Sequence, residues 1–179
     1  MLLSPAAAQA IDVHGERRAA VLAPLYRDEA GDLHAVFTRR RHDLRSHPGE
    51  ISFPGGRQDA GEDLRDTALR EACEEIGLPR DAVTVAGCLP PTPTVVTSYA
   101  IYPYVGAIDA GLAWVIQESE VADVLELRLR DVRDGYGRRR LARRGVPFKT
   151  DTYAVGEHVI WGATARIVRH LLERTGSLL

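Results

Sequence analysis

Short apolar runs separated by turn residues divide much of the chain into segments of strand length. Residues 18–26 and 33–38 are two such runs, and the stretch DEAGD at 28–32 between them has the composition of a turn. This pattern predicts a hairpin of two strands. The same criteria predict further strands at 82–89, 100–108, 146–155 and 158–161.

Apolar residues at helical spacing mark two longer segments. One is residues 162–174, and the other ends before Gly77 and carries Leu64, Ala68, Leu69, Ala72, Cys73 and Ile76. Ser4 followed by Pro5 has the sequence of a helix start, so a short helix is expected up to about Ile11. Strands alternating with such helices are compatible with an α/β protein, although the pattern alone does not establish a fold.

The length and composition indicate one globular domain over residues 1–179, with 1–17 as an N-terminal extension. Hydrophobic residues make up 45% and charged residues 27%, as in soluble proteins, and a formal net charge of −2 does not favour nucleic acid or an anionic membrane as a partner. The N-terminal sequence lacks the basic start of a secretory signal, and no stretch reaches the roughly 20 apolar residues of a membrane span. A cytoplasmic protein is expected.

The two cysteines predict neither a zinc site nor a disulfide framework. Cys73 falls at the apolar side of the helix before Gly77, so we expect it to pack. Cys88 lies within a strand-like apolar run.

An acidic face stands out on the same helix. At about 100° per residue, Glu71, Glu74 and Glu75 share an arc about 100° wide, which we expect to look away from most of the core. Like charges at this spacing cost a helix roughly 0.2 to 0.5 kcal/mol each, so the cluster suggests a neutralising divalent cation. Magnesium is commonly held by one or two carboxylates with substrate phosphates in the remaining positions.

The residues around the acidic face suit such a site. Arg70 is placed to orient a carboxylate through a charge-assisted hydrogen bond. The pair Gly55 and Gly56 permits a tight turn that brings a backbone carbonyl toward the metal, and Gly77 stands where a helix C-cap is expected.

Together these positions resemble the Nudix box, whose pattern is G, five residues, E, seven residues, R-E-U-x-E-E-x-G-U. The residues that match it are Gly56, Glu62, Arg70, Glu71, Glu74, Glu75, Gly77 and Leu78, with Ala72 as a small U residue. The resemblance implies the Nudix fold, an α/β/α sandwich with a mixed β-sheet, and Mg²⁺ or Mn²⁺ as cofactor. It assigns the metal to Glu71, Glu75, Glu74 and the backbone of Gly56, and catalysis to Glu74, Glu75 and Arg70.

The stretch before the box also resembles the signature of the coenzyme A pyrophosphatase branch. It assigns substrate binding to Arg40, Arg45, Gly49 and Phe53, beside Thr38 and the FPGG sequence at 53–56. Arg41 departs from the signature, which usually has serine or alanine there. The sequences PPTPTVV after Leu89, YPYV at 102–105 and IWGATA at 160–165 also resemble this branch.

For several further residues the sequence supports both a functional and a structural interpretation. Tyr99, Tyr102 and Tyr104 are candidates to stack on adenine, or else core residues; Glu120 is a candidate general base or metal ligand, or else a loop glutamate. The basic run 138–144 reads as an exposed connection between strands, with binding of a 3′-phosphate as the alternative. His158 and His170 are expected to be structural.

The reaction implied is metal-dependent hydrolysis of coenzyme A or acyl-coenzyme A to 3′,5′-ADP and (acyl-)4′-phosphopantetheine. Two alternatives stay open: a Nudix hydrolase of ADP-ribose or a dinucleotide, and a non-catalytic ligand-binding Nudix module. The ligand is a small nucleotide, and the chain is expected to be a monomer or homodimer.

Overall fold

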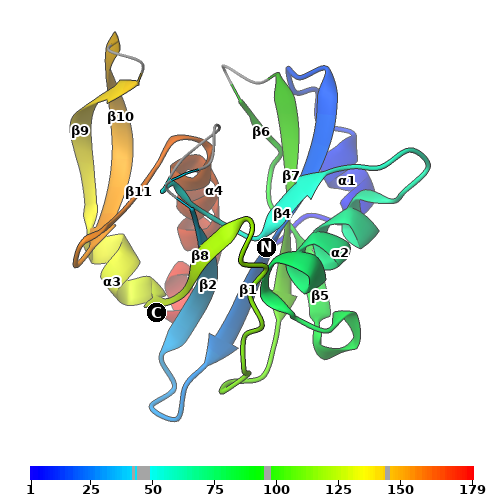
Figure 1. The fold of residues 1–179 in the computed structure, drawn as a ribbon, viewed down its shortest axis with the longest axis horizontal. Helices are drawn as coiled ribbons and strands as arrows, with labels where there is room; N and C mark the ends of the chain where they lie inside the picture. The colour runs from blue at the N-terminus through cyan, green and yellow to red at the C-terminus, as the bar shows by residue number, and fades with distance from the viewer. Residues whose placement is uncertain (42, 44–48, 95–97, 144–145) are drawn as a thin grey trace.

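The computed structural model describes the chain except residues 42, 44–48, 95–97 and 144–145. Its centre is a mixed sheet (Figure 1). The strands of this sheet are β1 (Arg17–Arg27), β2 (Leu33–Arg40), β3 (Ile51–Ser52), β4 (Gly55–Arg57), β5 (Thr84–Cys88), β6 (Thr92–Pro93), β7 (Tyr99–Ala107) and β8 (Val121–Arg128). β1 and β7 run parallel, whereas β1 pairs antiparallel with β2 and with β4. The predicted hairpin is confirmed, with Leu25 opposite Ala35.

Side chains alternate across β1 and so divide the interior into two cores. Ala20 and Leu22 pack against helix α2 (Leu64–Ile76), while Ala23 and Leu25 pack in the core that also contains helix α4 (Gly162–Thr175). Burying one large aliphatic side chain contributes about 1.5 to 3 kcal/mol, so both layers are held mainly by apolar contact. Two helical layers on opposite faces of a mixed sheet confirm the predicted fold class.

A second, three-stranded antiparallel sheet lies beside α4 (Figure 1). It consists of β9 (Tyr136–Arg143), β10 (Val146–Val155) and β11 (His158–Trp161), and α3 (Leu129–Asp134) leads into it. The prediction of an exposed connection at 138–144 was therefore wrong for residues 138–143. Arg138, Arg139 and Arg140 are exposed, and consecutive arginines hide the alternation by which a strand is recognised, but pairing with β10 satisfies the backbone.

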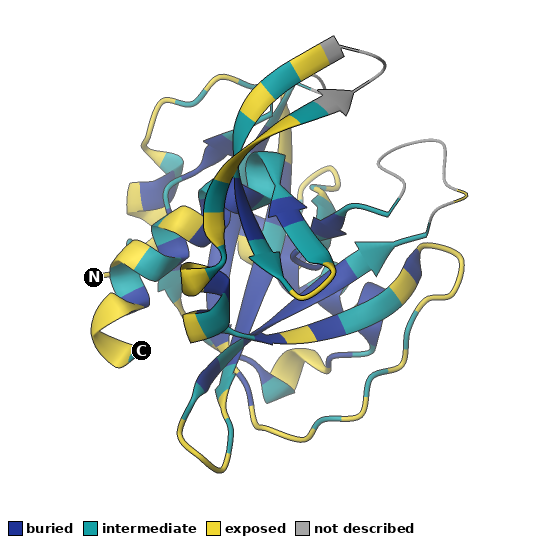
Figure 2. Cartoon of the chain, turned by 90° about the vertical axis from the view of Figure 1, so that its left-hand side faces the viewer, coloured by how far each residue is buried: buried dark blue, intermediate teal, exposed yellow. Residues whose placement is uncertain are grey.

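The remaining elements are short: α1 (Pro5–Gln9) and the 3₁₀ turns at Arg80–Ala82 and Gly176–Leu178. The predicted cap is present, because the Ser4 hydroxyl accepts from the Ala7 N–H at 3.2 Å. Figure 2 shows buried residues concentrated along the central strands and exposed residues along the outer helices and turns. In the described part of the chain, no helix is long and apolar enough to cross a membrane.

Candidate active site

The helix α2 ends at the Gly77 cap that the sequence predicts, and a side chain caps its start. The Asp63 carboxylate caps it by accepting from the Arg65 N–H at 2.8 Å, and Gly77 ends it in the left-handed conformation with φ of 68°. Because Gly77 supplies a positive φ at no steric cost, the helix stops before the buried Leu78.

Glu75 does not face solvent, contrary to the expectation that the whole acidic arc looks away from the core. Its side chain is buried, and its Oε2 accepts from the Gly55 N–H at 3.3 Å. On the helical wheel Glu75 falls about 20° from Leu64 and Ala68, within the apolar stripe, whereas Cys73 lies about 40° beyond Leu69. Cys73 is accordingly exposed, which corrects its predicted packing, while Cys88 is buried as a core residue.

Burial raises the pKa of Glu75 to about 8, and the negative charges of Glu71 and Glu120 act in the same direction. The Gly55 N–H and Arg40 oppose this shift. Burial also raises the pKa of Glu71. Ionisation of either carboxyl in the folded protein therefore costs free energy, and a bound cation would reduce that cost.

Strand β4 lies directly against these carboxylates because it begins with two glycines. A Cβ at Gly56 would lie 2.5 Å from Glu71 Oε1, and a Cβ at Gly55, where φ is 156°, would lie 2.4 Å from the Ala20 carbonyl oxygen. The first contact involves the end of a flexible side chain and the second involves backbone. Gly56 thus makes room for the Glu71 carboxylate, and Gly55 makes room for β1.

Arg70 is the centre of a charged network behind the site. Its guanidinium donates to Glu62 Oε1 at 2.9 Å, to Glu71 Oε1 at 2.9 Å and to Glu74 Oε2 at 3.1 Å. Glu62 also accepts from the Thr67 hydroxyl at 2.7 Å, and the Arg70 bonds lower the pKa of Glu62 to about 2. Arg70 therefore fixes three of the box glutamates, where the sequence predicted one.

The oxygen donors suit a hard divalent cation. Glu71 and Glu75 come together with the Gly55–Gly56 backbone, whereas Glu74 is exposed and turned toward Arg70. Within the described residues, no three acidic, histidine or cysteine side chains form a ready metal cluster. Two carboxylates still match how magnesium is held when phosphate oxygens complete its shell.

Arg40 and Glu120 flank the carboxylates. Arg40 Nη1 lies 3.9 Å from Glu120 Oε2, and the buried Arg40 Nε has no hydrogen-bond partner among the described residues. Arg41 donates to Asp43 and to the Glu118 carbonyl at 2.7 Å, on a different surface from Arg40. The guanidinium of Arg41, the residue that departs from the signature, therefore has local hydrogen-bond partners.

The other predicted substrate residues differ in their placement. Phe53 is buried and stacks on Phe37, with ring centroids 4.4 Å apart. It therefore mainly shapes the floor of a pocket on this face of the sheet. Gly49 has φ of 68° and donates its N–H to the Arg41 carbonyl. Arg45 lies outside the described residues.

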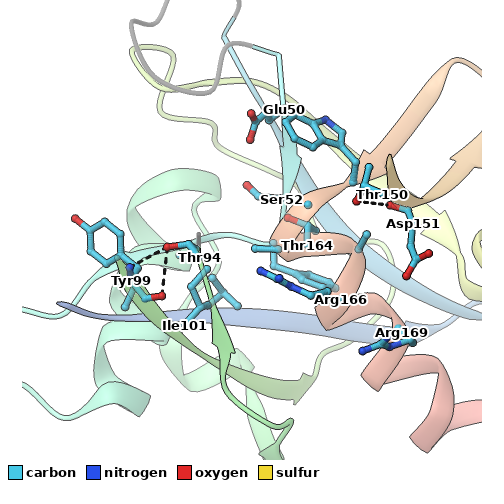
Figure 3. Close-up of a pocket in the computed structure, with 18 of the residues that line it drawn as sticks. Glu50, Ser52, Thr94, Tyr99, Ile101, Thr150, Asp151, Thr164, Arg166 and Arg169 are labelled. Atoms are coloured by element: carbon cyan, nitrogen blue, oxygen red, sulfur yellow. Dashed lines mark hydrogen bonds between the residues drawn. The ribbon is translucent and has the colours of Figure 1, made fainter. Parts of the chain in front are cut away.

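A pocket of about 1500 Å³ opens on the sheet face opposite α2, and Figure 3 shows side chains of the sheet and of α4 around it. Gly55 and Gly56 line it from β4, so the strand that contacts the carboxylates also borders the pocket. Among its described lining residues, seven are cationic and three acidic, a net charge of +4 in a chain of net charge −2. The cationic ones are Arg17, Arg40, Arg57, Arg138, Lys149, Arg166 and Arg169.

Sequence reasoning missed most of the cations in this wall. Arg166 and Arg169 lie three residues apart on α4, a spacing that was visible in the sequence but had no motif attached. Of the three tyrosines, Tyr99 lines the pocket, whereas Tyr102 and Tyr104 are buried in the core against α2. Adenine stacking on Tyr102 and Tyr104 is therefore excluded, because their rings point to the other side of the sheet.

The sequence comparisons agree with this geometry. The model of the NUDIX domain family matches residues 16–144. The chain is 38% identical over 168 residues to the uncharacterized Nudix hydrolase NudL of Enterobacter sp. (strain 638), covering 92% of this chain and 86% of that protein. The chain belongs to the Nudix family.

This Nudix hydrolase also resembles solved structures. It matches the Nudix hydrolase RenU of M. smegmatis with a TM-score of 0.66 and 17% identity, covering 99% of this chain and 95% of that one. It matches the NUDIX domain of Shewanella oneidensis NrtR, solved with ADP ribose, with a TM-score of 0.61 and 15% identity, covering 93% and 91%. These identities show the shared fold. Membership of this family makes the protein a pyrophosphohydrolase. Enzymes of the family act on small nucleotides and generally use divalent metal ions.

Proposed function

We propose that this Nudix hydrolase cleaves the diphosphate of coenzyme A or acyl-coenzyme A, giving 3′,5′-ADP and (acyl-)4′-phosphopantetheine. The observation that carries the proposal is a strongly cationic pocket of about 1500 Å³ lined by Gly55 and Gly56, the two residues of β4 that also contact the box carboxylates. In this proposal the diphosphate binds at the β4 edge of the pocket, which is lined by Arg40 and by Gly56, the neighbour of the Glu71 carboxylate. The signature residues Arg40 and Phe53, which both line the pocket, favour coenzyme A over other nucleotides.

Mg²⁺ or Mn²⁺ would be held by Glu71, Glu75 and the Gly56 carbonyl, with Glu74 nearby. A divalent cation neutralises charge on phosphate oxygens and lowers the pKa of water, which supplies the nucleophile. The chain's own residues provide the rest. Arg70 holds the box glutamates in position, and Arg40 orients the diphosphate through bidentate hydrogen bonds.

Glu120 is the proposed general base, with Glu74 and Glu75 acting beside it. Glu120 lies in the turn directly before β8, and its charge acts on Glu71 and Glu75. Its side chain is about half exposed (53%), which suits a group that exchanges protons with water. Arg40 at 3.9 Å keeps the carboxylate near the diphosphate.

Hydrolysis of ADP-ribose is the second candidate, because the similar NUDIX domain of NrtR was solved with ADP ribose. The deciding experiment is a magnesium-dependent assay of the purified protein against coenzyme A, acyl-coenzyme A, ADP-ribose and dinucleotides, with products identified by mass. We expect coenzyme A to give 3′,5′-ADP at the highest kcat/KM. A higher kcat/KM for ADP-ribose would contradict the proposal.

A further inference from the structure

Arg166 is an uncompensated cation in the wall of the pocket. Its Nη2 donates to the Pro93 carbonyl, and its buried Nε has no hydrogen-bond partner in the described structure. No carboxylate of the described residues lies within ion-pair distance of it. Burial and the neighbouring Arg169 lower the pKa of Arg166. Since a partly buried charge without a partner is costly, the site is built to receive an anion.

Arg169 lies one turn further along α4 and adds a second charge to the same wall (Figure 3). Its nearest carboxylate oxygen among the described residues is Glu173 Oε1 at 3.9 Å, a long contact between two side chains that are each about half exposed. Such a pair contributes little, and the Arg169 guanidinium remains able to bind a ligand. The two arginines therefore act on the same part of the pocket.

This part of the pocket is separated from the carboxylates by the width of several strands. Arg57 in β4 lies opposite Ala19 in β1, Ala19 lies opposite Ile101 in β7, and Ile101 lies opposite Thr92 in β6. Three strand spacings amount to about 14 Å. Arg166 contacts β6 at Pro93, whereas Gly56 of β4 contacts Glu71. The two phosphates of one diphosphate share a bridging oxygen, so they lie too close together to span the three strand spacings from β4 to β6.

We propose that Arg166, assisted by Arg169, binds a phosphate monoester on the ribose of the substrate, separate from the diphosphate that is cleaved. The planar guanidinium matches a phosphate dianion through paired hydrogen bonds. The protein then selects nucleotides with three phosphates arranged as a diphosphate and a ribose phosphate. This inference rests on the proposed function only in taking the substrate to be a nucleoside diphosphate derivative.

Binding without turnover tests the inference directly. Calorimetry would compare 3′,5′-ADP, 2′,5′-ADP and AMP on the wild type, Arg166→Gln, Arg166→Lys and Arg169→Gln. Arg133→Gln is the matched control, because Arg133 is exposed on α3 and does not line the pocket. We expect at least one bisphosphate to bind the wild type about 10-fold more tightly than AMP. The better bisphosphate identifies which ribose oxygen carries the phosphate.

In Arg166→Gln this preference should fall to about 2-fold, with the affinity for AMP unchanged. Arg166→Lys should recover part of the preference because it keeps the charge, and Arg133→Gln should behave as the wild type. Equal binding of all three ligands by the wild type would overturn the inference. So would an equal loss for all three ligands in Arg166→Gln, which would make the arginine structural.

Turnover of coenzyme A and dephospho-coenzyme A separates this inference from the proposed function. If coenzyme A is preferred and Arg166→Gln removes the preference, both stand. If both are cleaved equally well by the wild type, the function stands and the inference is wrong. If neither is cleaved but the bisphosphate preference depends on Arg166, the inference stands and the coenzyme A assignment is wrong.

Discussion

The two sides of the active site are built in opposite ways. On the acidic side, Arg70 and the glycines of β4 hold the glutamates through short contacts. On the basic side, Arg40 and Arg166 each have a buried Nε without a hydrogen-bond partner in the described structure. The acidic side is thus held in place by contacts within the protein, whereas the basic side keeps hydrogen-bond donors for the proposed substrate. We therefore expect substitutions on the acidic side and on the basic side to have different effects.

The largest effect should follow from Glu75→Gln. The amide keeps the size of the side chain but removes a charge that the proposed cation needs, so kcat should fall about 10³-fold or more. The measurement is the rate of nucleotide hydrolysis at saturating magnesium. Glu29→Gln, at an exposed turn position, should retain wild-type kcat. Near-normal turnover by Glu75→Gln would remove Glu75 from the metal site.

Gly56→Ala should reduce kcat by about 10²-fold, because the new methyl group occupies the position of the Glu71 carboxylate. The displaced group is a flexible side chain, so the thermal midpoint should change little. Gly55→Ala should instead destabilise the fold by about 1 to 3 kcal/mol, since its methyl group meets the backbone of β1. Gly176→Ala, with open space around it, is the control for both. The reverse pattern, with unfolding in Gly56→Ala and not in Gly55→Ala, would contradict this account of β4.

On the basic side, Arg40→Ala should lower kcat/KM about 10- to 100-fold with little change in thermal unfolding. Arg41→Ala is a neighbouring control, since Arg41 is held by Asp43 and Glu118 outside the pocket. Steady-state kinetics and a thermal melt of each variant distinguish the roles. A large drop in melting temperature with preserved kcat/KM would make Arg40 structural.

A last effect concerns stability and pH in the absence of metal rather than catalysis. Burial raises the pKa of Glu75 from 4.5 to about 8, so the folded protein binds a proton there that the unfolded chain has released. This contribution is complete below about pH 4.5 and is lost as the pH rises through 8, which amounts to on the order of 3 kcal/mol after allowing for relaxation.

Denaturant unfolding in a chelator at several pH values measures this loss. Glu75→Gln should remove this part of the pH dependence and be more stable than the wild type at pH 9. Saturating magnesium should also reduce the slope in the wild type, because the cation replaces the proton. A wild-type stability that is independent of pH between 5 and 9 in chelator, or a slope that Glu75→Gln leaves in place, would argue against a costly Glu75 charge.

The acidic side was largely predictable from sequence because its chemistry is local. The box glutamates, Arg70 and the cap at Gly77 fall within one loop and one helix, where spacing determines which groups meet. Burial of Glu75 was not foreseen, although its angle on the helical wheel lies within the apolar stripe. The strands 146–155 and 158–161 were predicted with their observed bounds, since glycines separate these short runs from their neighbours in the sequence.

The basic side was not predictable in the same way because it forms by long-range packing. Arg166 meets Pro93 from 73 residues away, and no local pattern indicates that contact. The sequence left adenine stacking and core packing open for the tyrosines, and the pleat decides for the core at Tyr102 and Tyr104 by sending them away from the pocket. The identity of a strand's two faces depends on which helix covers each of them.

The pocket wall made by β10, β11 and α4 comes from a single C-terminal segment, which matters for how the protein evolves and how it is engineered. It is contiguous in the sequence, and it lies beyond residue 144, where the match to the family model ends. The part proposed to contact the distal end of a substrate is therefore encoded separately from the part proposed to carry the reaction. A chimera that exchanges this C-terminal segment between relatives should transfer preference among nucleotides while leaving the hydrolytic residues in place.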